Sequence, residues 1–234
     1  MTDFPFRCVG FDLDGTLVES HRDLGEAVNH ALSEGGFEPV PIEDVTDLIG
    51  GGAKVMLRRA LDQQGGVPDE EFRKLYKTML RYYDGHVAVH TRPYPGVIAV
   101  LDELAARGVV LSVVTNKFEG FARGVLGALD LTDRFACIIG GDTLGKDADG
   151  NYRAKPLADP INAAREASGG GSFAFVGDSS YDVMAARAAG VPVVAAAYGY
   201  CDGPAEELGA DAVIADFAGL IPALEGLPKA DSPR

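Results

Sequence analysis

Cysteine is scarce in this chain, which has only Cys8, Cys137 and Cys201 among its 234 residues. An odd number of widely spaced cysteines excludes a small protein held together by a disulfide framework. Two of the three lie inside apolar runs, where a free cysteine behaves as a small hydrophobic side chain. The cysteines therefore indicate a reducing, cytoplasmic setting.

Positive charge is also in short supply, because 21 Lys and Arg face 35 Asp and Glu for a formal net charge of -14. Such a surface repels a nucleic-acid backbone, so we expect no nucleic-acid partner. It also repels small anions. A phosphate site on this chain would therefore require local lysines, backbone amides and a metal ion to reverse the field.

The chain has no apolar run long enough to span a bilayer, and its first residues lack the basic, apolar and small-residue order of a signal peptide. We therefore expect a cytoplasmic protein with no membrane association. Apolar residues make up 47% and charged residues 24%, as in ordinary globular proteins. The length of 234 residues allows one large domain, or one domain with a smaller insert. Nothing in the sequence indicates an oligomeric state.

Hydrophobic periodicity divides the chain into two kinds of region. Apolar residues recur at helical spacing through residues 20–90, which predicts a mostly helical segment. After a Pro-rich stretch, helical patterns alternate with short β-branched runs, which predicts parallel strands joined by crossover helices. The predicted strands are residues 7–10, 109–114, 136–139, 173–176, 191–195 and 212–214. The expected fold class is α/β, a doubly wound parallel sheet formed by residues 1–18 and 91–234, with residues 19–90 inserted as an α-helical cap.

Two aspartates follow the first predicted strand. Asp12 and Asp14 lie two residues apart and would share one side of the strand, which Gly15 and Thr16 then end. Open α/β sheets bind their ligands at the carboxyl ends of their strands. The simplest way to relieve the repulsion between the two carboxylates is a bound divalent cation. A surface Asp-Gly turn explains the same residues equally well. The helical insert begins beside this point and would form a lid over it.

Polar residues also end three later strands or precede the helices that follow them. Thr115 and Asn116 lie before a helix expected near Glu119 and could bind phosphate oxygens, although a helix N-cap explains them alone. Lys155 could supply a cation to the same phosphate, although a lone lysine is more often solvated. Asp178 at a strand tip could hold a metal together with Asp12, and Asp182 in the first turn of the next helix could steady it.

The order and placement of these four segments resemble the haloacid dehalogenase superfamily, which implies a Rossmann-like core. The resemblance implies that Asp12 is the nucleophile that forms an aspartyl-phosphate and that Asp14 is the general acid and base. It also implies a Mg²⁺ cofactor held by Asp12, the main-chain carbonyl of Asp14, and Asp178. Thr115, Asn116 and Lys155 would bind the phosphoryl group. Asp182 would steady the metal site without binding the metal directly.

Within the superfamily, residues 7–226 look most similar to the phosphoglycolate phosphatase branch. The segments that carry this finer resemblance are residues 17–24, 49–53, 92–96 and 198–200. It implies that 2-phosphoglycolate, a small phosphorylated acid, is hydrolysed to glycolate and phosphate. Two departures border the predicted site: a short insert at 146–154, and His21 and Arg22 where the branch usually has small residues and proline.

A glycine-rich loop in the predicted cap precedes a helix expected to begin near Ala53. Gly51 and Gly52 allow the backbone to approach a small ligand closely, and the helix N-terminus could meet a substrate carboxylate. Lys54 could assist there. A plain loop before a helix is the alternative.

Three other functions compete with a phosphoglycolate phosphatase. The chain could be a phosphatase for a sugar phosphate, a nucleotide or pyrophosphate. It could be a hexose phosphate mutase, although Thr16 resembles the hydrolases more than the mutases. A noncatalytic binding module is expected to lack Asp12, Asp14 or Lys155, and this chain has all of them.

Overall fold

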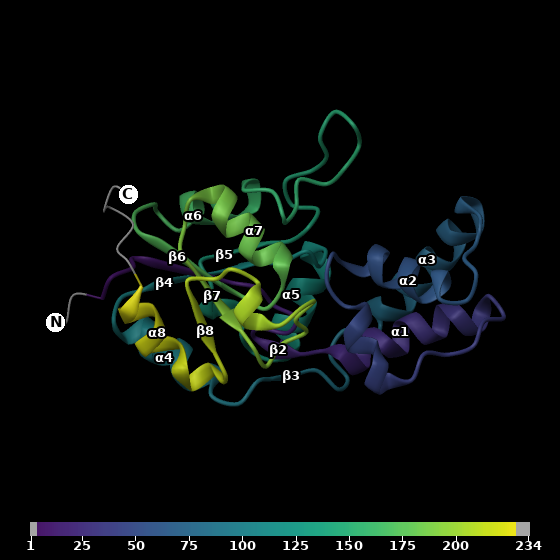
Figure 1. Cartoon of the computed structure of the whole chain (residues 1–234), viewed down its shortest axis with the longest axis horizontal. Coiled ribbons are helices and arrows are strands. Elements are labelled where there is room, and N and C mark those ends of the chain that lie inside the picture. The colour runs from purple at the N-terminus through teal and green to yellow at the C-terminus, as the bar shows by residue number, and fades with distance from the viewer. Residues whose placement is uncertain (1–3, 228–234) are drawn as a thin grey trace.

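The computed structural model describes residues 4–227, and it contains a sheet flanked by helices and a further group of helices to one side (Figure 1). The strands of the sheet run parallel in the order β5-β4-β1-β6-β7-β8. They are β1 (Cys8–Phe11), β4 (Val110–Val114), β5 (Cys137–Ile139), β6 (Phe173–Gly177), β7 (Val193–Ala196) and β8 (Ala212–Ile214). The predicted doubly wound sheet is therefore confirmed.

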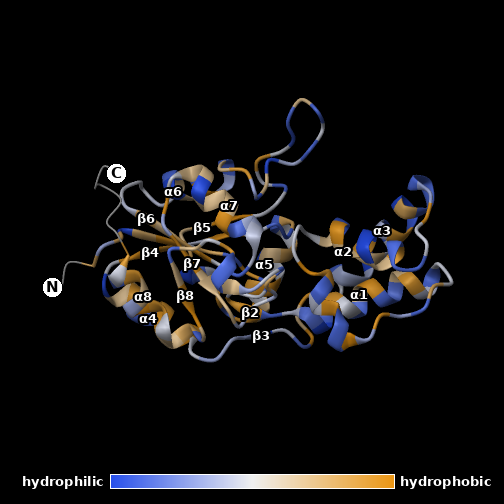
Figure 2. Cartoon of the chain, viewed as in Figure 1, coloured by the Kyte–Doolittle hydropathy of each residue, from blue (hydrophilic) through white to orange (hydrophobic). Residues whose placement is uncertain are grey.

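Helices cover both faces of the sheet, as crossover connections require. One face packs against α4 (Val97–Ala106), α5 (Glu119–Ala128) and α8 (Leu220–Gly226), and the other against α6 (Asp159–Ala167) and α7 (Ser180–Ala189). Successive residues of β1 point to opposite faces, so Val9 and Phe11 join the first cluster and Cys8 the second. The strands are hydrophobic along their length (Figure 2). Short 3-10 turns complete the core at η2 (Thr132–Arg134), η3 (Ala205–Glu207) and η4 (Phe217–Gly219).

The central position of β1 determines where a ligand can bind. Phe11, the last residue of β1, pairs with Val113 of β4 on one side and Val176 of β6 on the other. The chain crosses from β1 to β4 in one direction and returns to β6 in the other. The carboxyl end of β1 is therefore the switch point of the sheet, where open α/β sheets bind their ligands.

The helical cap has a hydrophobic core of its own. It consists of α1 (His21–Glu34), η1 (Ile42–Leu48), α2 (Ala53–Asp62) and α3 (Asp69–Asp84). Leu57 and Leu61 of α2 are fully buried in this core, and each such burial stabilises the fold by about 1.5–3 kcal/mol. The exact division of the chain into core and cap, at residues 18 and 90, stays a prediction.

Two short strands connect the cap to the core. The chain leaves the core through β2 (Val18–Glu19) and returns through β3 (Arg92–Pro93), and the two strands pair antiparallel. Just inside the cap, the buried carboxylate of Asp23 accepts hydrogen bonds from the backbone N–H of His90 at 2.9 Å and of Thr91 at 2.8 Å. The Thr91 hydroxyl donates a third, at 2.6 Å. Asp23 therefore fastens the outgoing chain to the returning one.

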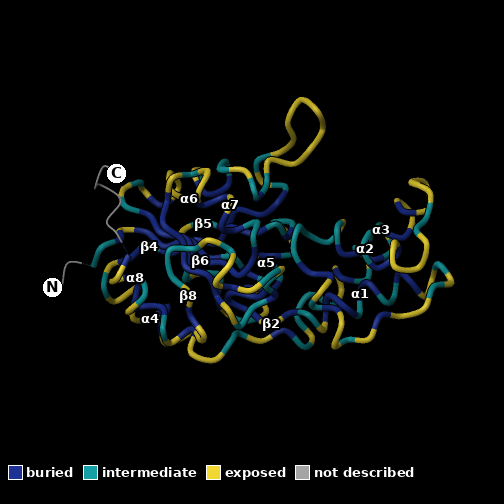
Figure 3. The backbone as a smooth tube through the Cα atoms, viewed as in Figure 1, coloured by how far each residue is buried: buried dark blue, intermediate teal, exposed yellow. Residues whose placement is uncertain are grey.

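The insert at 146–154 projects from the core as an exposed loop (Figure 3). Lys146 pairs antiparallel with Tyr152, and the turn between them contains Asp149 and Gly150. The segment is therefore a small hairpin, whose turn is closed by a hydrogen bond from the Gly150 N–H to the Asp147 carbonyl. In residues 4–227, no helix is both long and apolar enough to cross a membrane. The three cysteines are free thiols.

We expect Asp23→Ala to destabilise the protein by about 2–4 kcal/mol, because it leaves the buried N–H and hydroxyl of Thr91 and the part-buried N–H of His90 without an acceptor. Unfolding in urea would measure the loss. Arg22→Ala is the matched control: Arg22 is exposed, and its removal should change the free energy of unfolding by less than about 0.5 kcal/mol. An Asp23→Ala protein as stable as the control would show that the linkers do not depend on this carboxylate.

Candidate active site

The carboxyl ends of β1, β4 and β6 meet at one cavity of about 70 Å³ beside the cap. Segments far apart in the sequence contribute to it. Its lining includes the predicted site residues Asp12, Asp14, Gly51, Gly52, Thr115, Asn116, Lys155 and Asp178. The structure therefore brings together the catalytic, phosphate-binding and metal-binding candidates and the cap glycines, while the roles assigned to them stay predictions.

Lys155 is a buried cation between two carboxylates. Its Nζ lies 3.0 Å from Asp12 Oδ2 and donates a hydrogen bond to Asp182 Oδ1 at 2.5 Å, and its side chain is only 2% exposed. Burial alone would lower the pKa of Lys155, but the two carboxylates outweigh burial and raise it. The ammonium group is therefore charged and fixed in position at the cavity.

Asp182 supports the site without lining the cavity. Its Oδ2 accepts hydrogen bonds from the backbone N–H of Asp178 at 3.2 Å and of Ser179 at 3.0 Å, and from the Ser179 hydroxyl at 2.6 Å. Its other oxygen binds Lys155. The N-terminus of α7 thus holds Asp182 in a capping box, and Asp182 holds Lys155.

Asp178 is fixed by donors on both of its oxygens. The Thr16 hydroxyl donates to Oδ1 at 2.9 Å, and the Tyr200 N–H donates to Oδ2 at 2.7 Å. Two glycines permit this close approach. A Cβ at Gly15 would lie 2.2 Å from Asp178 Oδ2, and one at Gly199 would lie 2.4 Å from Asp178 Cβ. Any larger residue would displace the carboxylate.

Three of these carboxylates form a cluster that could hold a divalent cation. Oxygen atoms of Asp12, Asp178 and Asp182 lie within 4.8 Å of one another. Burial raises the pKa of Asp12 to about 7 although Lys155 acts to lower it, and burial together with Asp182 raises the pKa of Asp178. Hard divalent cations prefer such oxygen ligands and would relieve this repulsion. Because Asp12 and Asp178 line the cavity and Asp182 does not, Asp12 and Asp178 are the carboxylates that fit a cation best.

Asp14 is held by two residues that the sequence analysis did not include. The Ser20 hydroxyl donates to its Oδ1 at 2.5 Å, and Lys117 Nζ lies 2.9 Å from its Oδ2. Lys117 Nζ also donates to the Tyr83 hydroxyl of α3 at 2.9 Å. Lys117 could have been suspected, because it directly follows Asn116. Tyr83 could not, because it continues the apolar spacing of a core helix.

Tyr200 is a fourth residue that the sequence analysis left out of the site. Its hydroxyl accepts hydrogen bonds from the N–H of Ser20 at 2.7 Å and of His21 at 3.0 Å, and burial raises its pKa to about 12. It therefore ties the loop after β7 to the start of the cap. The described residues that line the cavity include neither His21, which packs edge-on against Tyr200, nor the exposed Arg22.

The cap glycines lie directly over the core loop that follows β4. Gly51 and Gly52 have φ values of 65° and 87°, and a Cβ at Gly52 would lie 3.2 Å from the Asn116 carbonyl oxygen. Only glycine adopts this conformation freely and leaves room for the contact. Lys54 is different, because it is exposed and lines an outer groove rather than the cavity.

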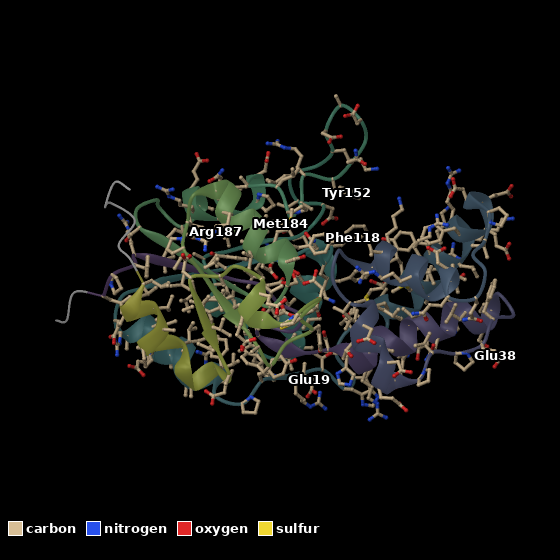
Figure 4. The ribbon with its side chains drawn as sticks, viewed as in Figure 1. Glu19, Glu38, Phe118, Tyr152, Met184 and Arg187 are labelled. Carbon is tan, nitrogen blue, oxygen red and sulfur yellow. The ribbon has the colours of Figure 1, made fainter. Side chains whose placement is uncertain are left out.

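That outer groove, about 560 Å³ in volume, adjoins the cavity and is strongly basic. The insert forms one of its walls, where Tyr152 packs edge-on against Phe118 opposite the cap (Figure 4). Its acidic lining residue is Asp69, which is paired with a groove arginine at 3.1 Å. Its basic lining residues are Lys54, Arg58, Arg73, Lys146 and Lys155. The chain thus reverses its acidic field locally, as a phosphate site on it requires.

Comparisons with known proteins agree with this geometry. A family model described as haloacid dehalogenase-like hydrolase matches residues 9–196. The chain is 42% identical over 217 residues to the phosphoglycolate phosphatase of Agrobacterium fabrum, covering 92% of this chain and 90% of the relative. It is 40% identical over 221 residues to the phosphoglycolate phosphatase of Rhodospirillum rubrum, covering 92% of this chain and 89% of the relative. A crystal structure from Haemophilus somnus, titled a predicted phosphoglycolate phosphatase, superimposes with a TM-score of 0.84 at 32% identity, covering 94% of this chain and 98% of that one.

We expect Lys155→Met to destabilise the protein by about 3–5 kcal/mol, because it leaves the buried carboxylate of Asp182 and the half-buried carboxylate of Asp12 without their cation. Urea unfolding in the presence of a chelator would measure the loss. The double variant Lys155→Met/Asp182→Asn removes one of the two charges and should recover at least half of it. If the double variant unfolds as easily as the single one, the cost arises from packing rather than from charge.

Proposed function

Because the chain belongs to the haloacid dehalogenase-like hydrolases, we propose that it is a Mg²⁺-dependent phosphatase whose substrate is 2-phosphoglycolate. The observation that carries the proposal is the position of Asp12. Its carboxylate lies at the switch point of the sheet, beside the buried cation Lys155 and close to Asp178. Relatives named phosphoglycolate phosphatase, at 36% to 42% identity over most of the chain, support the substrate.

Asp12 acts as the nucleophile in this proposal. Its Oδ1 accepts a hydrogen bond from the Leu13 N–H at 2.7 Å, which fixes the orientation of the carboxylate. An Asp12 oxygen attacks phosphorus, the bond from phosphorus to the glycolate oxygen breaks, and an aspartyl-phosphate forms. Lys155, together with Thr115 and Asn116, binds the phosphoryl oxygens and reduces the repulsion between two anions.

Asp14 moves the protons of both steps. It donates a proton to the departing glycolate oxygen and then takes one from the water that attacks the aspartyl-phosphate. That second attack releases phosphate and restores Asp12. Ser20 and Lys117 hold the carboxylate of Asp14 in position for both transfers.

The donor set fits Mg²⁺. Asp12 and Asp178 supply carboxylate oxygens, and the main-chain carbonyl of Asp14 is the third proposed ligand. When bound, Mg²⁺ neutralises charge on the phosphoryl group. Thr16 and Tyr200 each donate a hydrogen bond to one oxygen of Asp178, and these bonds would keep the carboxylate in place to hold the cation.

The relatives of this chain favour a small acidic substrate. Relatives named phosphoglycolate phosphatase match most of the chain at 36% to 42% identity. We therefore prefer 2-phosphoglycolate over sugar phosphates and nucleotides, and hydrolysis over transfer between sugar hydroxyls.

Asp12→Asn should lower kcat for 2-phosphoglycolate at least about a thousandfold, because the amide cannot form the aspartyl-phosphate. A phosphate-release assay would measure this, with Glu38→Gln at the exposed far end of the cap as the control that keeps full activity. Acid quenching of the native enzyme during turnover should trap one added phosphoryl group on the peptide that contains Asp12. Wild-type turnover by Asp12→Asn would refute the nucleophile.

Thr16→Val should raise the Mg²⁺ concentration needed for half-maximal activity by about 10-fold to 100-fold, since it removes a hydrogen bond that orients Asp178 while keeping the side-chain shape. Activity would be measured against added Mg²⁺ after treatment with a chelator. Chelation alone should stop the wild-type enzyme, and Mg²⁺ should restore it. Full activity of chelated wild-type protein would contradict the proposed cofactor.

A further inference from the structure

The charged side chains of the cavity leave one cation without a role in binding the phosphoryl group. Within residues 4–227, the charged residues that line the cavity are Asp12, Asp14, Asp178, Lys117 and Lys155. Lys155 is held by Asp12 and Asp182 at the phosphoryl position. A doubly acidic substrate brings a carboxylate as well as a phosphate, so it needs a second cation in the same cavity. Lys117 is the remaining one.

Lys117 is buried, although slightly less deeply than Lys155. Its side chain is 5% exposed, and its Nζ binds Asp14 Oδ2 and the Tyr83 hydroxyl, each at 2.9 Å. An ammonium group has three N–H donors. Among the described residues these two partners use two donors, so a third is available to a ligand.

Lys117 lies near the place where the leaving group of the substrate would bind. It lies in the loop between β4 and α5, and its backbone N–H donates to Thr115 Oγ1 at 3.2 Å. Thr115 is a candidate phosphoryl ligand, whereas Tyr83 belongs to the cap. Lys117 Nζ lies between Asp14 of the core and Tyr83 of the cap. In 2-phosphoglycolate only an ester oxygen and a methylene separate the phosphorus from the carboxylate, so both acidic groups must bind in neighbouring places.

We propose that Lys117 binds the carboxylate of the substrate and thereby selects phosphomonoesters whose leaving group is acidic, an inference that rests on the proposed function. The ammonium is shared between the substrate carboxylate and Asp14. It therefore holds the leaving group beside the residue that protonates its oxygen. Tyr83 positions the ammonium from the cap, so that carboxylate recognition requires the cap to be in place.

A purely structural role for Lys117 makes a different prediction. If Lys117 only oriented Asp14, its loss would slow proton transfer to every leaving group by the same factor. If it binds the carboxylate, its loss must penalise an acidic substrate more than a neutral one of the same shape. The ratio of kcat/KM for two such substrates separates the two roles.

The experiment compares 2-phosphoglycolate with its neutral amide, 2-phosphoglycolamide, in the wild type and in Lys117→Met. We expect the acid-to-amide ratio of kcat/KM to fall by about 30-fold to 100-fold in Lys117→Met, the loss typical of a buried charge-assisted hydrogen bond. Lys117→Arg keeps the cation and should retain most of the ratio. Lys77→Met, at an exposed lysine of the helix that carries Tyr83, is the matched control and should leave the ratio unchanged.

Lys117→Gln is a second variant in case Lys117→Met does not fold, because the amide of glutamine can still donate a hydrogen bond to Asp14. The ratio must fall in this variant as well. Equal losses on the acid and the amide in folded Lys117 variants would overturn the inference. A wild-type enzyme that does not hydrolyse 2-phosphoglycolate would overturn the proposed function instead, so the two failures are distinguishable.

Discussion

Like charges gathered in a protein interior repel one another, and the half-buried Asp12 and the buried Asp178 and Asp182 have oxygen atoms within 4.8 Å of each other. The surrounding structure offsets this repulsion. Lys155 lies between two of the carboxylates, and the N-terminus of α7 supplies N–H donors to Asp182. A metal ion would complete the balance at Asp12 and Asp178. The need to offset this repulsion constrains the loops at the ends of β1 and β6 and the position of Lys155 before α6.

Hydrogen bonds and an ion pair also connect the carboxylates of the core to the cap. Asp14 is bound by Ser20, at the start of the cap, and by Lys117, which also binds Tyr83 of α3. Tyr200 joins the two parts by accepting the N–H of Ser20 while its own N–H donates to Asp178. A movement of the cap would therefore alter the surroundings of the proposed proton-transfer residue. In the proposed mechanism substrate recognition and proton transfer depend on the same side chain, because Lys117 is proposed to bind the substrate carboxylate and also contacts Asp14.

Much of the fold could be predicted because its signals are local. Short β-branched runs mark the strands, and the helices begin at Ala53, Glu119 and Ser180, close to where the sequence predicts. The predicted strand-end residues lie together because parallel strands bring their carboxyl ends to one edge, a consequence of topology rather than of any single motif.

The rest of the site depends on tertiary contacts that the local sequence pattern does not reveal. Tyr83 has the spacing of a core residue in α3, yet its hydroxyl binds Lys117. Tyr200 reaches Ser20 across 180 positions of sequence. Lys54 was expected beside Gly51 and Gly52, but a loop pattern does not tell which side of the following helix faces the ligand. In the structure the glycines line the cavity, and Lys54 is exposed on the outer groove.

The outer groove resolves the conflict between an acidic chain and an anionic substrate. The formal charge of -14 would repel a phosphate ester from most of the surface. The groove gathers Lys54, Arg58, Arg73 and Lys146 near Lys155, with the paired Asp69 as the acidic residue of its lining. It also shares Asn116, Lys155 and the cap glycines with the cavity, so the basic surface continues to the phosphoryl position. Since a concave basic surface in an acidic molecule focuses the attraction of anions, substrate approach is favoured along this groove. The insert at 146–154 supplies both a cation and an aromatic wall to it.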